Sequence, residues 1–144
     1  MLPVLVLVPL ALIAQFYFVE NARERGLAFT HDSGSREKNY IIEAKGAGVA
    51  VADVNGDGWD DIYFVNGAPL HGGSVPPAPR HRLFLNRQDG TFRDATEESG
   101  LGDTGYGAGA YFADVDNDGD LDCYLTQFGP NRLYRNEGTG RFVP

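Results

Sequence analysis

At 144 residues, 42% of them hydrophobic, the chain can build one domain with a core, and its nineteen glycines and eight prolines favour turn-rich β-structure over a helical bundle. The net charge is −8, and no basic stretch is dense enough to follow a phosphate backbone, which argues against a nucleic-acid partner. The single cysteine, Cys123, excludes an intrachain disulfide.

The N-terminus is an apolar run. Residues 2–19 are almost wholly apolar, which predicts a signal peptide or a membrane anchor over residues 1–19 and therefore export. Arg23 and Arg25 follow the run and no basic residue precedes it, an arrangement that the positive-inside tendency associates with a cytoplasmic location for the rest of the chain. We favour export, because the acidic loops further along suit the calcium level outside cells. A buried helix is the alternative.

A lead-in segment follows at residues 20–45. It is polar apart from two short apolar runs, at residues 27–29 and 40–42, with a turn-like stretch at 31–35 between them. The pattern predicts a strand, a turn and an approach to the next segment.

The rest of the chain is an internal repeat. The stretch GAGVAVADVNGDGWDDIYFVNG, residues 46–67, recurs sixty-one residues later from Gly107, with eleven identities in twenty-five aligned positions. A second match, of residues 81–92 with 131–142, has an offset of fifty. The first copy therefore contains an insertion of eleven residues, within the Pro- and Gly-rich residues 68–80, which is typical of a surface loop.

Each copy contains four short strand-like runs. In the first copy they are residues 48–53, 62–65, 82–86 and 91–95, and in the second they are 109–114, 123–126, 132–136 and 141–143. Four strands at a period near fifty residues are typical of a β-propeller blade. We expect an all-β fold, a partial β-propeller of about two four-stranded blades, with repeat 1 at 46–106 and an incomplete repeat 2 at 107–144. Residues 49–52 of the first run are Val-Ala-Val-Ala with no polar alternation, which predicts an inner strand covered on both faces.

An aspartate-rich loop follows the first run of each copy, and the two loops hold nine of the twenty carboxylates. Counted from the first aspartate, side-chain oxygens stand at positions 1, 3, 5 and 9, glycine stands at 6, and position 7 can offer its backbone carbonyl. The expected ligands are Asp53, Asn55, Asp57, Trp59 through its carbonyl, and Asp61 in the first loop, and Asp114, Asp116, Asp118, Asp120 through its carbonyl, and Asp122 in the second. Hard oxygens in a tight loop predict one Ca²⁺ in each copy, which would relieve the repulsion between the carboxylates.

An EF-hand, a magnesium site and a metal-free turn fit the two loops less well. An EF-hand needs a glutamate at position 12, where Phe64 and Leu125 stand, and it needs helical flanks. Mg²⁺ suits a cage made wholly of protein oxygens poorly. A solvated acidic turn without metal is the remaining alternative, and a second copy in register argues against it.

These motifs resemble the FG-GAP or VCBS-type repeats of calcium-binding β-propellers such as the integrin α head. The Gly-Ala-Gly opening, the acidic loop, YFVNG at 63–67, RLFLN at 82–86 and GTF at 90–92 are most similar to exported proteins of the ASPIC/UnbV group, related to cartilage acidic protein. The resemblance covers residues 29–144. It implies a seven-bladed propeller in the full-length family, so two blades predict a fragment.

Catalysis is not expected. His31, His71 and His81 have no neighbouring acid or nucleophile at a spacing typical of a triad or a zinc site. The preferred function is an exported calcium-binding repeat module in which Ca²⁺ is structural and which mediates adhesion to an extracellular protein or glycan. The alternative is the propeller part of a secreted enzyme, such as a polysaccharide lyase, with its catalytic residues outside this sequence. A cytosolic calcium sensor is a third interpretation, which the export signal opposes.

Overall fold

The computed structural model describes residues 17–35, 37–70 and 79–144. Most of the apolar run predicted to be a signal peptide or anchor, residues 1–16, lies outside the described residues, as does His71. Within the described ranges, no helix combines the length and the apolar character needed to cross a membrane.

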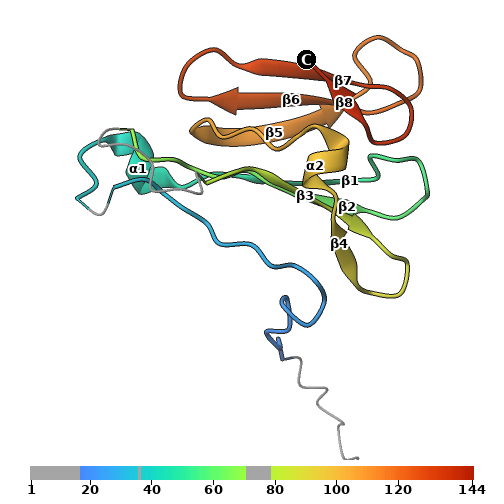
Figure 1. Ribbon diagram of the computed structural model, residues 1–144, viewed down its shortest axis with the longest axis horizontal. Helices are drawn as coiled ribbons and strands as arrows, with labels where there is room; N and C mark the ends of the chain where they lie inside the picture. Colours follow the sequence, from blue (N-terminus) through green and yellow to red (C-terminus); the bar gives the residue numbers. More distant parts are fainter. Residues whose placement is uncertain (1–16, 36, 71–78) are drawn as a thin grey trace, which may run out of the picture.

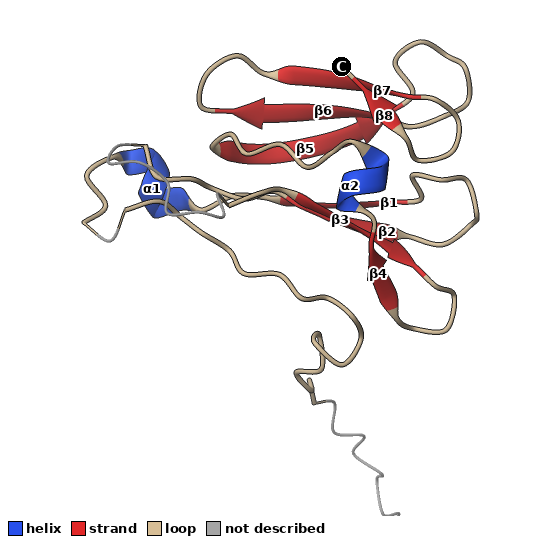
Figure 2. Ribbon diagram, viewed as in Figure 1, coloured by secondary structure: helices blue, strands red, loops and turns tan. Residues whose placement is uncertain are grey.

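The described chain forms two four-stranded antiparallel sheets (Figure 1 and Figure 2). Sheet A consists of β1 (Val49–Ala52), β2 (Asp61–Phe64), β3 (Arg82–Asn86) and β4 (Phe92–Asp94), in that order. Sheet B consists of β5 (Gly107–Ala113), β6 (Asp122–Gln127), β7 (Arg132–Asn136) and β8 (Phe142–Val143), also in order. The prediction of an all-β fold with about two four-stranded blades is confirmed, and each strand lies within two residues of its predicted bounds.

The register repeats from sheet to sheet. In sheet A, Tyr63 on β2 pairs with Ala50 on β1 and Leu83 on β3. Its counterpart Tyr124 on β6 pairs with Tyr111 on β5 and Leu133 on β7. Because the side-chain period of a strand is two, this shared register places equivalent residues on equivalent faces of the two sheets.

The two sheets pack face to face around one core. The inner face of sheet A supplies Tyr63, Val65, Leu83 and Leu85, and the inner face of sheet B supplies Ala110, Cys123, Leu125 and Tyr134. The first strands, β1 and β5, lie against each other across this interface. The Tyr63 ring meets the Phe112 ring edge to face, with 6.1 Å between centroids. We call the two opposite surfaces the outer faces of sheet A and sheet B.

The expectation that β1 is covered on both faces is wrong. Ala50 and Ala52 are half-buried on the inner face, but Val49 is 57% exposed and Val51 is 58% exposed on the outer face. The apolar pattern suits a strand between two sheets, and in the part of the chain that the structure describes only one sheet packs against β1.

The strand predicted at residues 27–29 is also wrong. The backbone bonds there are local: the Leu27 N–H donates to the Ala22 carbonyl and the Phe29 N–H donates to the Leu27 carbonyl. Phe29 stacks on Phe64, with 4.6 Å between ring centroids, so its apolar side chain packs on the outer face of sheet A without strand pairing. The second apolar run opens a short helix, α1 (Ile41–Lys45).

The lead-in instead repeats the connection between the sheets. That connection contains the short helix α2 (Thr96–Ser99), in which the Ser99 N–H donates to the Ala95 carbonyl at 2.9 Å. Seventy-four residues earlier, the Arg25 N–H donates to the Asn21 carbonyl at 3.0 Å. A Gly-Leu pair follows each turn, at residues 26–27 and 100–101.

The glycine of each Gly-Leu pair packs closely against the backbone of the fourth strand of the sheet that follows it. A Cβ added to Gly26 would lie 2.2 Å from the Phe92 carbonyl oxygen on β4, and one added to Gly100 would lie 2.6 Å from the Phe142 carbonyl oxygen on β8. Residues 21–27 therefore occupy on sheet A the place that residues 95–101 occupy on sheet B, an equivalence that the sequence analysis missed.

Candidate metal centres

Each aspartate-rich loop joins the first two strands of its sheet. Residues 53–60 connect β1 to β2, and residues 114–121 connect β5 to β6. Gly58 and Gly119, at position 6, have φ of +86° and +98°, a region that residues with a Cβ rarely adopt. No atom lies within 4 Å of a Cβ added at either position, so glycine is needed there for its backbone conformation.

The first aspartate of each loop holds the turn in the same way. Asp53 accepts from the Asp57 N–H through Oδ1 at 3.0 Å and from the Gly58 N–H through Oδ2 at 2.7 Å. Asp114 accepts from the corresponding N–H groups of residues 118 and 119 at 3.2 and 3.1 Å. The two loops therefore adopt one conformation from different sequences.

Positions 5 and 7 are also related by one bond in both loops. Asp57 Oδ1 accepts from the Trp59 N–H at 3.0 Å, and Asp118 Oδ1 accepts from the Asp120 N–H at 3.0 Å. These bonds fix the chain direction at the two residues whose carbonyls were predicted as ligands. The Trp59 side chain is 47% exposed, in keeping with a contribution through the backbone.

Position 9 holds a buried aspartate that links the loop to the third strand. Asp61 is 1% exposed and accepts from the Val54 N–H at 3.1 Å and from the Asn86 N–H at 2.8 Å. Burial raises the pKa of Asp61, and these two bonds partly oppose that rise. Asp122 makes the equivalent pair of bonds in sheet B, at 3.0 and 2.8 Å.

In the second loop, three predicted ligands converge. One carboxylate oxygen from each of Asp114, Asp116 and Asp122 lies within 4.8 Å of the other two. Desolvation raises the pKa of Asp116, and so do the charges of Asp118 and Asp122. An all-oxygen donor set of this kind suits Ca²⁺, and a divalent cation would remove the repulsion among these carboxylates.

The first loop is less acidic at its centre. Asn55 stands at position 3, where the second loop has Asp116, and its Nδ2 donates to Asp57 Oδ2 at 3.2 Å. Asn55 Oδ1 accepts from the Asp57 N–H at 3.1 Å. The Asn55 amide is thus hydrogen-bonded to a carboxylate oxygen of Asp57 that was predicted to bind the metal. Three carboxylates converge in the second loop, so it is the better arranged of the two to bind a cation.

Two asparagines that the sequence analysis did not place in the site hold the two loops by hydrogen bonds to their backbone. Asn86 Nδ2 donates to the Asp60 carbonyl at 3.1 Å, and Asn136 Nδ2 donates to the equivalent Leu121 carbonyl at 3.1 Å. Asn136 Nδ2 also donates across the sheet interface, to the Val54 carbonyl at 2.8 Å. The repetition of an asparagine at the end of RLFLN and RLYRN was the available signal.

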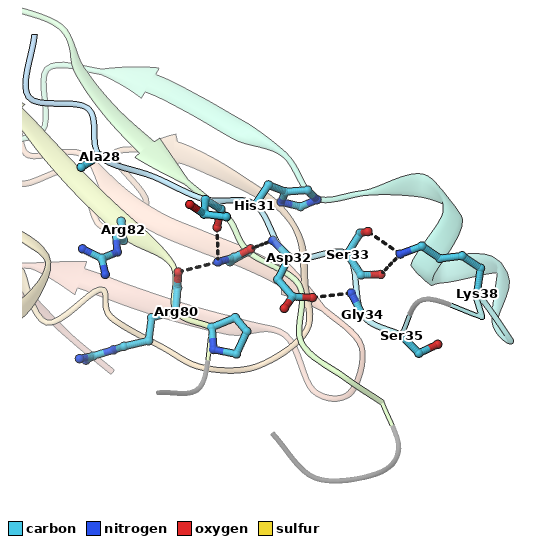
Figure 3. Close-up of a pocket in the computed structure, with 12 residues that line it drawn as sticks. Ala28, His31, Asp32, Ser33, Gly34, Ser35, Lys38, Arg80 and Arg82 are labelled. Atoms are coloured by element: carbon cyan, nitrogen blue, oxygen red, sulfur yellow. Dashed lines mark hydrogen bonds between the residues drawn. The ribbon is translucent and has the colours of Figure 1, made fainter. Parts of the chain in front are cut away.

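A separate open pocket of about 700 Å³ lies where the lead-in meets sheet A (Figure 3). Asn66, which is 4% exposed, is one of the residues that line it. Asn66 Oδ1 accepts from the Asp32 N–H at 2.7 Å, and Asn66 Nδ2 donates to the Arg80 carbonyl at 3.2 Å. Asn66 therefore fastens the lead-in to the sheet, a role that the sequence analysis did not predict.

The cations around this pocket have partners. Lys38 Nζ donates to the Ser33 carbonyl at 2.9 Å (Figure 3), and Arg82 pairs with Asp94 at 2.6 Å. Arg80 pairs with Glu97. The pocket is thus lined by polar groups that already make hydrogen bonds or ion pairs within the fold.

Comparison with protein-family models decides the class of repeat. The model of the FG-GAP-like repeat matches residues 74–125 and again residues 114–144. Residues 74–144 carry FG-GAP-like repeats. The two matches share residues 114–125, which contain the second acidic loop. No curated protein matches the chain. The prediction of an FG-GAP repeat protein is therefore confirmed at the level of the repeat, and this repeat together with the two sheets indicates a β-propeller-type module.

Proposed function

We propose that these FG-GAP-like repeats form an exported calcium-binding module of the ASPIC/UnbV type that binds an extracellular protein or glycan and carries out no catalysis. The observation that carries the proposal is the convergence of Asp114, Asp116 and Asp122 in a loop whose hydrogen bonds repeat in the other sheet. Export is supported by the apolar run at residues 2–19 of the sequence.

The calcium has a structural role in this proposal. Each loop closes the turn between the first two strands of its sheet, and its position-9 aspartate is hydrogen-bonded to the third strand. A cation that joins positions 1, 3 and 9 would therefore connect three strands. Because it binds the folded loop in preference to the unfolded chain, it would stabilise the fold by about 2.7 kcal/mol at a hundredfold excess over Kd.

Thermal unfolding tests the metal assignment. We expect Ca²⁺ to raise the melting temperature of the chain and Mg²⁺ to raise it much less, since Mg²⁺ keeps its waters. Equal shifts with the two cations would contradict selective binding.

Two variants separate a bound metal from general charge screening. Asp114→Asn combined with Asp116→Asn should remove one site from a calorimetric Ca²⁺ titration and leave one. Asp60→Asn is the matched control, because Asp60 is an exposed loop carboxylate outside the predicted ligand set, and it should leave two sites. Two sites in the double variant would show that the ligands are misassigned.

Recognition is tested with immobilised glycans and extracellular matrix proteins, in Ca²⁺ and in chelator. Binding that disappears in chelator is expected, because the loops order the surface that would bind. Absence of binding in both conditions would contradict the adhesion proposal and leave the metal assignment standing.

A further inference from the structure

In the described residues, each of the two surfaces that meet at the interface between the sheets recurs as an exposed surface on the other sheet. On the inner face of sheet A, Val54 is 2% exposed and Tyr63 and Leu83 are fully buried against sheet B. Their counterparts in the repeat, on the outer face of sheet B, are Val115, Tyr124 and Leu133, which are 55%, 42% and 46% exposed. The same surface is therefore buried in one repeat and open in the other.

The complementary surface is repeated in the same way. Ala110 on β5 is buried and Phe112 is half-buried on the inner face of sheet B. The residues that correspond to them on β1 are Val49 and Val51, which are more than half exposed on the outer face of sheet A. The outer face of sheet B thus corresponds to the inner face of sheet A, and the outer face of sheet A corresponds to the inner face of sheet B. The two outer faces point in opposite directions (Figure 1).

The lead-in lies against sheet A in the same way as the connection between the sheets lies against sheet B. Residues 95–101 lie beside the inner face of sheet B, and there the Leu101 carbonyl accepts from Tyr63 Oη at 2.9 Å. Residues 21–27 hold the equivalent place on sheet A, with Leu27 in the position of Leu101. The outer face of sheet A therefore includes the connection that a docking sheet would meet.

Polar groups support the same correspondence. Asn136 Nδ2 donates two hydrogen bonds, one within sheet B and one to the Val54 carbonyl of the opposite sheet. Asn86 Nδ2 donates the equivalent bond within sheet A, to the Asp60 carbonyl. The equivalent of the cross-sheet acceptor is the carbonyl of Val115, an exposed residue. A second copy would bring the Asn86 amide and this carbonyl together.

We propose that the outer face of sheet B docks onto the outer face of sheet A of a second copy of this chain, head to tail, and repeats the internal sheet interface between molecules. In that complex Tyr124 Oη donates to the Leu27 carbonyl, Asn86 Nδ2 donates to the Val115 carbonyl, and β5 lies against β1. Because such an interface uses two different surfaces, it can add further copies, in a ring if the rotation between copies closes and in an open filament if it does not.

The test is sedimentation velocity of the full chain over a wide range of protein concentration. We expect dimers and larger species. Tyr111→Lys with Leu133→Lys alters the outer face of sheet B, and Val49→Lys with Val51→Lys alters the outer face of sheet A. All four positions are exposed, so each double variant should fold, and each should weaken self-association by about tenfold or more, as charges in the centre of an apolar interface do. Thermal melting checks that both fold.

Mixing the two double variants gives the decisive result. Each variant keeps one intact face, so an equimolar mixture should form a one-to-one dimer and nothing larger. Ile41→Lys is the control, because Ile41 is 79% exposed on α1 and lies on neither sheet, and it should associate like the parent chain.

Four outcomes would overturn the proposal: a parent chain that stays monomeric, association that neither double variant weakens, a mixture that stays monomeric, or loss of association in one double variant alone. The last result would indicate a symmetric contact between two copies of the same face.

Discussion

Equivalent residues in the two sheets make the same hydrogen bond with different side chains. The buried His81 accepts from the Asn66 N–H through Nδ1 at 2.9 Å. In sheet B, the Gln127 N–H is bound at 3.2 Å by Asn131 Oδ1, fifty residues after His81. An imidazole nitrogen and a carboxamide oxygen thus serve as the same acceptor, but only the imidazole can titrate.

This substitution predicts a pH-dependent contribution from His81. Burial lowers the pKa of His81 from 6.5 to about 4, with Asp103 opposing the change and Arg132 adding to it. Between these pH values His81 binds a proton in the unfolded chain but not in the folded chain. The folded chain therefore keeps its full free energy of unfolding above pH 6.5 and loses up to about 3 kcal/mol of it as the pH falls. His81→Asn should abolish this loss while keeping the hydrogen bond.

Urea unfolding at neutral pH and near pH 4 measures the effect as the difference between the parent and His81→Asn. Acid effects on carboxylates are common to both proteins and cancel. A parent and a variant that lose equal stability would show that His81 does not stay neutral in the fold.

The two strand-end asparagines give a matched pair of variants. Asn136 is 2% exposed, donates two hydrogen bonds through Nδ2 and accepts two from glycine N–H groups. Asn86 is half-buried, donates one to a carbonyl and accepts one. We expect Asn136→Ala to lower the free energy of unfolding by about 2–3 kcal/mol and Asn86→Ala by about 1 kcal/mol, because buried partners left without a bond cost most. Chemical denaturation checks the order, and equal losses would contradict it.

At the scale of elements, the glycine of a Gly-Leu turn is required both for its backbone conformation and for its close contact with a strand. Gly100 and Gly58 both have positive φ, +78° and +86°. Only at Gly100 would a Cβ also meet backbone, the Phe142 carbonyl oxygen at 2.6 Å. Gly58→Ala should therefore cost about 1 kcal/mol for conformation alone. Gly100→Ala should cost clearly more, because α2 must move away from β8. Melting temperatures of the two variants measure the difference, and a smaller effect at Gly100 would contradict this contact.

The strands could be predicted from sequence because their signals are local. Short strand-like runs, turn residues and the repeat offset located all eight strands of the described chain, and ligand spacing located both loops. The exposure of Val51 could not be predicted, because it depends on which sheets are present to cover β1. The lead-in was misjudged for a related reason: residues 27–29 look like a strand, but the close approach of Gly26 to the Phe92 carbonyl and the stacking of Phe29 on Phe64 decide their place.

Within the candidate site, spacing predicted which residues gather but not what else they hold. The backbone bonds of Asp61 and Asp122 join the loop to the third strand, a link between segments twenty-five and fourteen residues apart. The difference between the loops also needed the structure, since it rests on the bond from Asn55 to Asp57.

At the scale of the whole molecule, one shared core should make the two sheets unfold together. The chain offers a probe in each: Trp59, the single tryptophan, reports on sheet A, and Cys123 reports on sheet B. Cys123 is fully buried, and burial raises its pKa to about 12, so it should react with thiol reagents only after unfolding.

Tryptophan fluorescence and thiol reactivity should therefore give the same urea midpoint, as expected of a two-state transition. The replacement Leu101→Ala, at a fully buried residue between the sheets, should shift both midpoints equally and cost about 2–5 kcal/mol. Separate midpoints would show that each sheet is an independent folding unit.

The Gly-Leu turn that precedes each sheet also bears on how these units can be exchanged between proteins. The turn covers the sheet that comes after it, so residues 21–94 contain sheet A together with its own cover, and the next unit of this kind starts at Ala95. A chimera joined just before such a turn would keep each sheet with the turn that precedes it, and would replace only the contacts that the turn makes with the sheet before it, such as the bond from the Ala95 N–H to the Leu83 carbonyl. A chimera joined at the Gly-Ala-Gly opening would separate a sheet from the turn that fits it.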